Sequence, residues 1–299
     1  MIARAGCCAL ACACAGWTLS AGAYSSGISG YTQGLACMGC HNNGVGTTIP
    51  ATGFSGPDVV VTGSSNSYSF GISAAGNGAV GGLDVSASAG TLATVAGSNT
   101  ELLSGEITHT APRSYIGAAT SWTFTLTAPA AEGSLTLAGC GLNANHNGTD
   151  TGDAGACTAK TITVKAPPVA GDDSYLVTED SGTSNLAVLA NDSDSSAIRV
   201  TAVNGSSSFP VLTAHGGSLA LSGPGAGNQL LYTPAADFSG TDTFTYQVTD
   251  TYSISSSGQV TVTVSAVNDA PRITAPPPDR AVEGLPYSAQ LPVTDPDDA

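Results

Sequence analysis

Short runs in which bulky and polar residues alternate recur along this chain, and no stretch keeps a helical apolar stripe for three turns. The clearest run is Trp122–Thr127, in which every second residue is a threonine. Such alternation is typical of a strand with one packed face and one solvated face. Because two packed sheets are the usual way to bury such faces, the sequence predicts an all-β chain of tandem β-sandwich modules.

The expected strands form two series, and each series is long enough for one sandwich of about 100 residues. The stretch before them, Tyr24–Val59, is rich in Gly, Asn and Thr and is expected to be irregular. The first series comprises Val59–Thr62, Ser67–Ser73, Leu83–Ser88, Ser121–Pro129, Ser134–Leu137 and Thr161–Lys165. The second series comprises Ser174–Val177, Leu186–Leu189, Ile198–Val203, Gln229–Thr233, Thr241–Thr249 and Gln259–Val267.

Two proline-containing linkers divide the chain. Ala166–Val169 contains consecutive prolines, which favour a stiff, extended conformation, and Val267–Pro271 forms the second linker. We therefore expect one domain at 24–165 and a second at 166–271. The remaining residues, 272–299, are expected to begin a further repeat that stops before it is complete, because two strands are not independently stable.

The first 23 residues have the pattern of a secretory signal peptide. Arg4 supplies a positive charge, an apolar stretch of small residues follows, and Ala21-Gly22-Ala23 offers a cleavage site. The apolar stretch is too short to span a bilayer permanently. A degenerate lipoprotein signal at Leu10-Ala11-Cys12 is an alternative. Either pattern predicts export to the surface of a bacterial cell. If the signal peptide is cleaved after Ala23, attachment to a membrane needs a carboxy-terminal anchor beyond Ala299.

The charge balance is strongly acidic, with 22 acidic residues against 7 basic ones. A field of this sign repels nucleic acid and anionic membranes and attracts cations. The sequence contains no nucleophile elbow, phosphate-binding loop, dinucleotide fingerprint or zinc-protease motif, so we do not expect an enzyme.

Cys37-Met38-Gly39-Cys40-His41 is the sharpest chemical motif in the chain. Two cysteines at this spacing can bind the two vinyl groups of haem, and the adjacent His41 is then placed as an axial iron ligand. Bacteria attach c-type haem outside the cytoplasm, so this chemistry requires export, which the signal peptide would provide. Two alternatives remain: a Cys37–Cys40 disulfide, or a zinc site formed by both cysteines and His41 with one further ligand.

The second axial ligand of such a haem would be a histidine. Met38 is the only methionine after the signal peptide and lies inside the motif itself. The candidates are His109, His146 and His215, of which His215 belongs to the second domain. Ligation by two histidines gives a lower potential than ligation by His and Met.

The first domain resembles a known family through motifs that occur in order. They are Tyr24–Gly30, the CxxCH, Gly53–Pro57, Val80–Ser88, Thr108–Thr110, Trp122–Phe124 and Asn143–Asn145. The resemblance is to secreted bacterial choice-of-anchor domains, which are distantly similar to reeler domains and carry CxxCH near the mature terminus. It implies His109 as the distal haem ligand, because the family's Thr-His run before the Trp strand falls there.

The second domain resembles the cadherin-like, immunoglobulin-like repeats of large bacterial surface adhesins. The motifs that carry this likeness are Gly171–Ser174, Thr178–Asp180, Val188–Asp194, Tyr232–Pro234, Phe238–Tyr246, Val248–Asp250 and Val267–Pro271. Residues 276–298 resemble the start of another such repeat. The resemblance implies immunoglobulin/cadherin-like sandwiches and a role at the cell surface.

Carboxylates in the turns of this domain are candidate calcium ligands, because calcium takes six to eight oxygens on a flexible frame. Six were expected to converge at one end of the sandwich: Asp172, Asp173, Glu179, Asp192, Asp194 and Asp250. Five were expected at the next junction: Asn268, Asp269, Glu283, Asp295 and Asp297. Asp and Asn also form turns without any ion, so solvated loop carboxylates are the alternative.

Cys140 and Cys157 enclose a polar loop of 16 residues. The pair is exported and has no other role, so we expect a structural disulfide that stabilises the fold by roughly 3 kcal/mol.

Two functions of different class follow. One is electron transfer or redox sensing by a haem on a calcium-stiffened stalk, with a redox protein as partner. The other is structural adhesion to a surface protein or polysaccharide, with Cys37 and Cys40 joined to each other.

Overall fold

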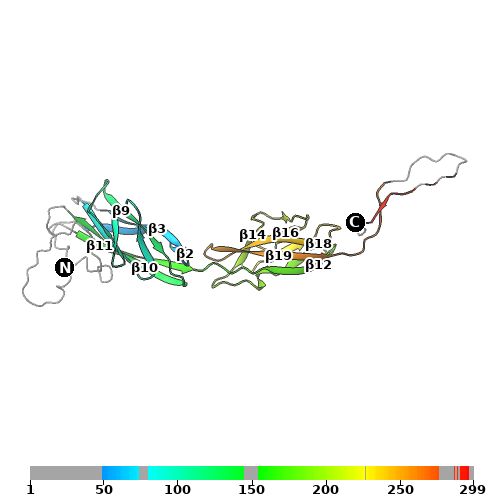
Figure 1. The fold of residues 1–299 in the computed structure, drawn as a ribbon, viewed down its shortest axis with the longest axis horizontal. Helices are drawn as coiled ribbons and strands as arrows, with labels where there is room; N and C mark the ends of the chain where they lie inside the picture. The colour runs from blue at the N-terminus through cyan, green and yellow to red at the C-terminus, as the bar shows by residue number, and fades with distance from the viewer. Residues whose placement is uncertain are drawn as a thin grey trace, which may run out of the picture. The chain divides into compact units, whose positions relative to one another are not determined.

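The computed structural model describes residues 49–73, 80–144, 154–225 and 227–275, together with 286, 288 and 290–295. The chain forms two compact units, Met1–Ala166 and Pro167–Ala299, each built from β-strands (Figure 1). The prediction of tandem β-sandwich modules is confirmed. Nowhere in the described ranges is there a helix long and apolar enough to cross a membrane. The predicted signal peptide and the CxxCH motif lie outside the described residues.

The first unit consists of two packed sheets. One has the strand order β1-β3-β9-β5, and the other has the order β2-β11-β10-β4-β7-β6 with β8 paired to β4. The strands are β1 (Ala51–Ser55), β2 (Val59–Val61), β3 (Ser65–Ser73), β4 (Val80–Ala87), β5 (Thr91–Thr94), β6 (Thr100–Leu103), β7 (Glu106–His109), β8 (Arg113–Ser114), β9 (Ala119–Thr127), β10 (Gly133–Ala144) and β11 (Ala154–Lys165).

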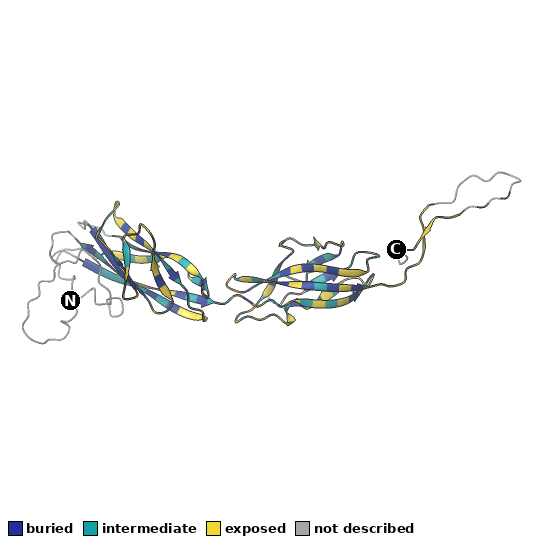
Figure 2. Cartoon of the chain, in the orientation of Figure 1, coloured by how far each residue is buried: buried dark blue, intermediate teal, exposed yellow. Residues whose placement is uncertain are grey.

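Alternation along β9 produces the core of this unit. Trp122, Phe124 and Leu126 are at most 1% exposed, whereas the threonines between them face outward or are half-buried. Tyr68 on the neighbouring strand β3 stacks on Phe124 with ring centroids 6.1 Å apart. Figure 2 shows the same alternation of buried and exposed positions along the strands of both units. Burial of these large aromatic side chains is the main stabilising contribution to the first unit.

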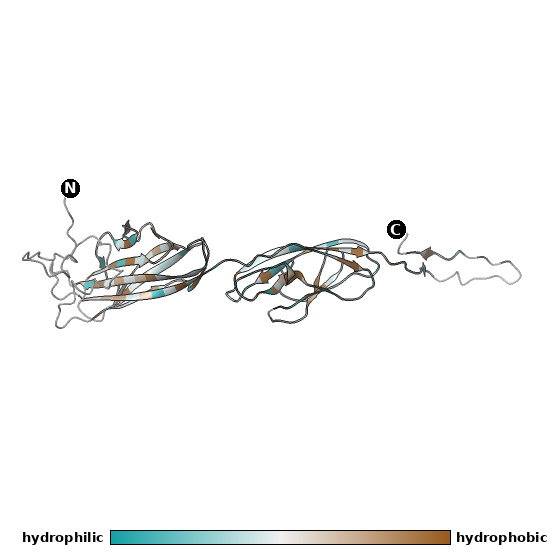
Figure 3. Ribbon diagram, turned by 90° about the horizontal axis from the view of Figure 1, so that it is seen from below, coloured by the Kyte–Doolittle hydropathy of each residue, from teal (hydrophilic) through white to brown (hydrophobic). Residues whose placement is uncertain are grey.

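The second unit is a smaller sandwich of two four-stranded sheets, β12-β19-β18-β14 and β13-β17-β16-β15. Its core contains Tyr232, Tyr246 and alternate valines of β19. Figure 3 shows hydrophobic and hydrophilic positions interspersed along its strands. The elements are β12 (Asp173–Thr178), β13 (Ser184–Leu186), the 3-10 helix η2 (Val188–Ala190), β14 (Arg199–Val203), β15 (Val211–Leu212), β16 (Ser218–Leu221), β17 (Leu230–Thr233), β18 (Gly240–Thr249), β19 (Ser255–Ser265), β20 (Arg272–Ile273) and β21 (Val293–Thr294).

Strand β12 runs parallel to β19, from the pair Asp173–Val260 to the pair Thr178–Ser265. The first strand of the unit therefore begins at one end of the sandwich, and the last strand finishes at the opposite end. We call these the entry end, near Asp173, and the exit end, near Ser265. This pairing decides which turn carboxylates can meet.

Two of the expected local structures are wrong. Ala51–Ser55 was expected to be irregular, but it is strand β1 and pairs with β3 because Thr52 and Phe54 alternate with exposed neighbours. The expected strand Leu186–Leu189 is divided, since β13 ends at Leu186 and η2 follows. The single 3-10 turn buries Val188 and redirects the chain.

Candidate functional site

His109 is the predicted site residue of the first unit that lies in the described part of the chain. It is the last residue of β7 and is half-buried. Its Nδ1 atom lies 3.2 Å from both the amide nitrogen and the carbonyl oxygen of Leu83 on β4. Burial lowers the pKa of His109, although the Leu83 carbonyl and the charge of Glu101 act in the opposite direction. The ring is therefore held in its neutral form against the edge of β4.

Gly82 lets the ring of His109 approach the backbone of β4. A Cβ atom at position 82 would lie 2.7 Å from Cε1 and 3.0 Å from Nε2 of His109. Such contacts are too short for any larger residue unless the ring moves. Gly82 is thus a positioning residue for His109. The sequence alone does not indicate this role, which follows from where the structure places the His109 ring.

We expect the first unit to lose stability as the pH falls below about 6.5, the ordinary pKa of His. Because the pKa of His109 is lowered in the folded state, the stability that this group contributes is present above pH 6.5 and is lost as the pH falls through the folded value. Thermal unfolding followed by Trp122 fluorescence measures this. A His109→Gln variant should show a weaker dependence between pH 7 and 5, and an equal dependence in both chains would contradict the assignment.

The other haem-site residues cannot be placed beside His109. Cys37, Cys40, His41 and His146 lie outside the described residues. His215 is exposed on the second unit, where its ring stacks on Phe238 at 4.7 Å.

The Cys140–Cys157 disulfide is present, with sulfur atoms 2.03 Å apart. The two cysteines are directly opposite each other in the β10–β11 ladder, and Asp84 on β4 is opposite Cys140 on its other side. Cys140 is 2% exposed. The bridge therefore fixes the register of the long β10–β11 hairpin.

At the entry end of the second unit, Asp172, Asp173 and Asp192 form what we call the entry cluster. The amide of Gly171 and the hydroxyl of Tyr246 both donate to Oδ1 of Asp192, at 2.7 and 2.8 Å. The hydroxyl of Tyr175 donates to Oδ1 of Asp173 at 3.2 Å. The Oδ2 atoms of Asp173 and Asp192 are buried and have no hydrogen-bond partner among the described residues.

The electrostatics of the entry cluster disfavour the charged form of Asp173. Its pKa is raised, first by burial and then by the neighbouring carboxylates Asp192 and Asp172, while hydrogen bonds from Tyr175 and Tyr246 act in the opposite direction. A buried carboxylate without a full set of donors gains from a bound cation. The unpartnered Oδ2 atoms of Asp173 and Asp192 are oxygen donors of the kind that calcium takes. The three carboxylates of the entry cluster do not all lie within 4.8 Å of one another.

Two further predicted ligands, Asp194 and Asp250, close turns of their own. Oδ2 of Asp194 accepts hydrogen bonds from both the amide and the hydroxyl of Ser196. Oδ1 of Asp250, in the β18–β19 turn at the same end, accepts from the amides of Tyr252 and Ile254. Oδ2 of Asp250 is buried and has no partner among the described residues.

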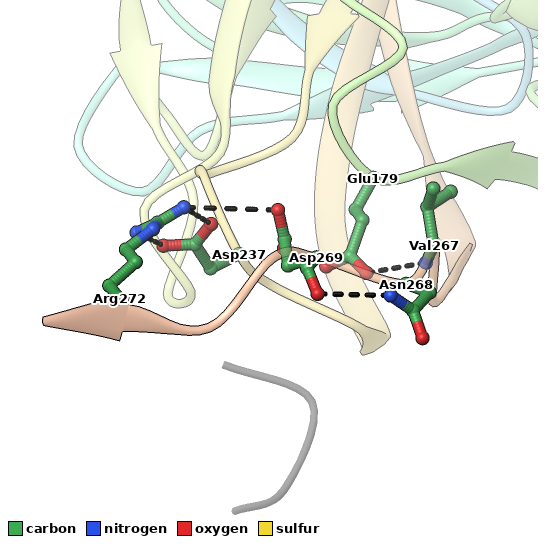
Figure 4. Close-up of polar contacts among 6 residues, drawn as sticks. All are labelled: Glu179, Asp237, Val267, Asn268, Asp269 and Arg272. Atoms are coloured by element: carbon green, nitrogen blue, oxygen red, sulfur yellow. Dashed lines mark hydrogen bonds and ion pairs between the residues drawn. The ribbon is translucent and has the colours of Figure 1, made fainter. Parts of the chain in front are cut away.

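Glu179 was expected at the entry end, but the structure places it at the exit end. It follows β12, which runs the length of the sandwich beside β19. Its Oε1 accepts the amide of Val267 at 2.6 Å, and its own amide donates to the carbonyl of Ser265. Glu179 is 3% exposed and holds the chain where it leaves the sandwich (Figure 4).

The exit end also carries three carboxylates that meet. One oxygen from each of Asp180, Asp237 and Asp269 lies within 4.8 Å of the others, and we call this group the exit cluster. Arg272 lies in it: Nη1 and Nη2 donate to the two oxygens of Asp237 at 2.7 and 2.8 Å, and Nη2 lies 3.8 Å from Oδ1 of Asp269 (Figure 4). The hydrogen bond and charge of Arg272 lower the pKa of Asp237.

The other ligands predicted for this junction do not join the exit cluster in the described part of the chain. Asn268 is exposed and donates its side-chain amide to the carbonyl of Asp269 at 3.0 Å. Asp295 follows β21 and is half-buried. Glu283 and Asp297 lie outside the described residues.

Sequence reasoning missed Asp180, Asp237, Arg272 and the buried Asp242. Asp242 is fully buried, and its Oδ2 accepts hydrogen bonds from the hydroxyls of Thr213 and Tyr232. The sequence signal for Asp242 is its phase, since it lies two residues before Phe244 and therefore on the same inward face of β18. No sequence signal links Arg272 to Asp237, because they meet only through the fold.

Comparisons with known proteins give one family match. Residues 164–263, about a third of the chain, match the model of the bacterial Ig domain. No curated protein matches the chain.

Among solved structures, similarity is found to a cohesin module of a family 33 glycoside hydrolase from Clostridium perfringens, with 13% identity over 40% of this chain and 98% of that one and a TM-score of 0.31. A CARDB domain from Pyrococcus furiosus in complex with di-metal ions gives 16% identity over 40% and 90%, with a TM-score of 0.25. The human desmocollin-1 ectodomain gives 11% over 76% and 44%, with a TM-score of 0.27.

These TM-scores are too low to support an argument about sites or partners, so the fold class rests on the sheets of the chain itself. The second unit is similar to the bacterial Ig domain, and a chain of such sandwiches has the build of a modular cell-surface protein of adhesion type.

Proposed function

We propose that the chain is an exported surface protein whose first unit binds one c-type haem, with His109 as the second axial ligand. The observation that supports this is the setting of His109. Its Nδ1 atom lies 3.2 Å from both the amide nitrogen and the carbonyl oxygen of Leu83. In the tautomer that is protonated at Nδ1, the ring donates to the carbonyl and leaves the lone pair of Nε2 for iron. A histidine that ligates a metal through one nitrogen usually donates from the other to a carbonyl or carboxylate.

The residues fit such a group in chemistry. Cys37 and Cys40 would form the two thioethers, and His41 would be the proximal ligand. His109 is kept neutral, which is the form that binds iron, and Gly82 fixes its ring. A haem held there supplies one-electron transfer, which suits electron exchange with a redox partner or redox sensing at the cell surface.

The experiment is expression with the leader in a host competent for cytochrome c maturation, followed by absorption spectroscopy of the denatured and native protein. We expect one covalently bound haem per chain, and no covalent haem in a Cys40→Ala variant. His109→Gln should keep the covalent haem but change the ligand-sensitive bands, whereas the matched His215→Gln should change nothing. A colourless wild-type protein would remove the haem proposal.

The second candidate function is structural: a surface adhesin in which Cys37 and Cys40 are joined to each other and calcium stiffens the repeat. The observation that favours calcium is the pair of unpartnered Oδ2 atoms on Asp173 and Asp192. Asp172 is a further acidic residue beside Asp173. Asp250 lies in the β18–β19 turn at the same end of the sandwich, and Asp194 follows Asp192 by two residues. Such a spacer would present its partner-binding modules to a surface protein or polysaccharide.

An Asp173→Asn variant tests calcium at the entry cluster. Without calcium at neutral pH, we expect the variant to unfold at a higher temperature than the wild type, because ionised Asp173 is unfavourable in the folded state. The sign follows from its raised pKa: the stability that depends on protonation is present below the unfolded pKa and is lost as the pH rises through the folded value.

With millimolar calcium the order should reverse, since only the wild type keeps the complete ligand set. Unfolding followed by tyrosine circular dichroism measures both conditions. A calcium-induced rise of equal size in the two chains would exclude the entry cluster as the site.

A further inference from the structure

Unlike the entry cluster, the exit cluster contains a positively charged side chain, that of Arg272. Arg272 is the first residue of β20, and its guanidinium donates to both oxygens of Asp237. The second terminal nitrogen also lies 3.8 Å from Asp269 (Figure 4). The charges of Asp237, Asp269 and Asp180 all raise the pKa of Arg272. Arg272 therefore interacts electrostatically with every member of the exit cluster.

This arrangement does not fit the calcium site that was predicted for the junction. Calcium needs six to eight oxygens at close range, and both oxygens of Asp237 are already engaged by Arg272. A calcium ion bridging Asp180 and Asp269 would lie close to the guanidinium and would be repelled by it. The predicted ligand Asn268 turns its side-chain amide to a backbone carbonyl instead.

We propose that Arg272 is the resident cation of the exit cluster, and that it excludes calcium from this end of the repeat. The planar guanidinium matches a carboxylate in two parallel hydrogen bonds, which a spherical ion does not require. Asp237 lies in the turn after β17, and Arg272 lies beyond β19. The pair therefore fastens the departing chain to the sandwich.

Glu179 completes the fastening from the other side. Its buried carboxylate accepts the amide of Val267, five residues before Arg272. The segment Val267–Arg272 is thus held at both of its ends by carboxylates of the second unit. The departing chain is held by groups of the protein itself, so we expect its order not to depend on the calcium concentration.

The test uses the full chain with Asp173→Asn as background, so that calcium binding at the entry cluster does not obscure the result. In this background, we expect calcium to leave the unfolding temperature of the second unit unchanged. Adding Arg272→Met should produce a rise of a few degrees with millimolar calcium, because the guanidinium no longer competes with it for the three carboxylates. Arg272→Lys should restore the calcium-independent behaviour, since a cation remains. Arg199→Met is the matched control, which removes the same charge from an exposed position of the same unit.

The outcomes separate this proposal from the calcium site at the entry cluster. A rise that appears with Arg272→Met and disappears again with Asp180→Asn supports the resident cation. The proposal is overturned if Arg272→Met gives no new calcium response, or if the background chain already responds to calcium and Asp180→Asn abolishes that response. If calcium stabilises the background chain and Asp180→Asn does not change this, then Asp173 is not a required ligand at the entry cluster. The proposal for Arg272 is then still decided by comparing the calcium-induced shift with and without Arg272→Met.

Discussion

Replacement of Asp242 by alanine should destabilise the second unit by about 2–6 kcal/mol, because two buried hydroxyls lose their acceptor at once. Asp242 is fully buried, and its Oδ2 accepts from Tyr232 at 2.9 Å and from Thr213. Burial, together with the hydrogen bond to Asp242, raises the pKa of Tyr232, so this hydroxyl remains a donor at all relevant pH values. Each unsatisfied buried hydroxyl costs about 1–3 kcal/mol.

Urea unfolding measures this effect. Tyrosines occur in both units, so the second unit is followed as the tyrosine circular dichroism transition that does not coincide with the transition in tryptophan fluorescence. Trp122 is the only tryptophan after the predicted signal peptide and belongs to the first unit, so the fluorescence transition is an internal control that should not move. Adding Tyr232→Phe and Thr213→Val to Asp242→Ala should recover part of the loss, because no hydroxyl is then left unpaired. If the triple variant is as unstable as the sum of the separate losses, the three residues do not act as a hydrogen-bonded unit.

Removal of the Cys140–Cys157 disulfide should destabilise the first unit by about 3 kcal/mol. The bridge closes 16 intervening residues, and its loss frees the unfolded chain. The Cys140→Ala/Cys157→Ala chain is the appropriate variant, because a single substitution leaves a reactive thiol. Trp122 fluorescence should show the shift, and the part of the tyrosine signal that does not follow Trp122 should stay in place. An unchanged first transition would mean that the β10–β11 ladder alone sets the order of this hairpin.

The long strands were predictable from their side-chain phase. Trp122–Thr127 alternates bulky residues with threonines, and Thr243–Thr249 does so except at Gln247. These runs lie in β9 and β18, strands of nine and ten residues that each pair on both sides. The short strands β5, β6 and β7 were not predicted. Thr91–Thr94 contains one bulky residue, so its strand character arises from pairing with β9 and not from its own sequence.

The candidate site was less predictable, because turn residues reveal their chemistry but not their position. Asp173 begins β12 and Glu179 directly follows it, so the strand places these residues, six apart in sequence, at opposite ends of the sandwich. The opposite holds for Asp237 and Arg272, which are far apart in sequence and share two hydrogen bonds. The sequence therefore identifies acidic turn residues that can act as ligands. Their division between the two ends of the sandwich depends on the strand order, which the sequence does not show.

The parallel pairing of β12 with β19 has a mechanical consequence for a protein exposed to drag at a cell surface. Tension that enters the second unit through β12 and leaves through β19 pulls these neighbours in opposite directions along their common ladder. The hydrogen bonds of all six residue pairs, from Asp173–Val260 to Thr178–Ser265, are then loaded in shear at the same time. They therefore do not break one pair after another. Resistance to forced unfolding is governed by the unfolding rate, and this geometry places its barrier in one strand pair.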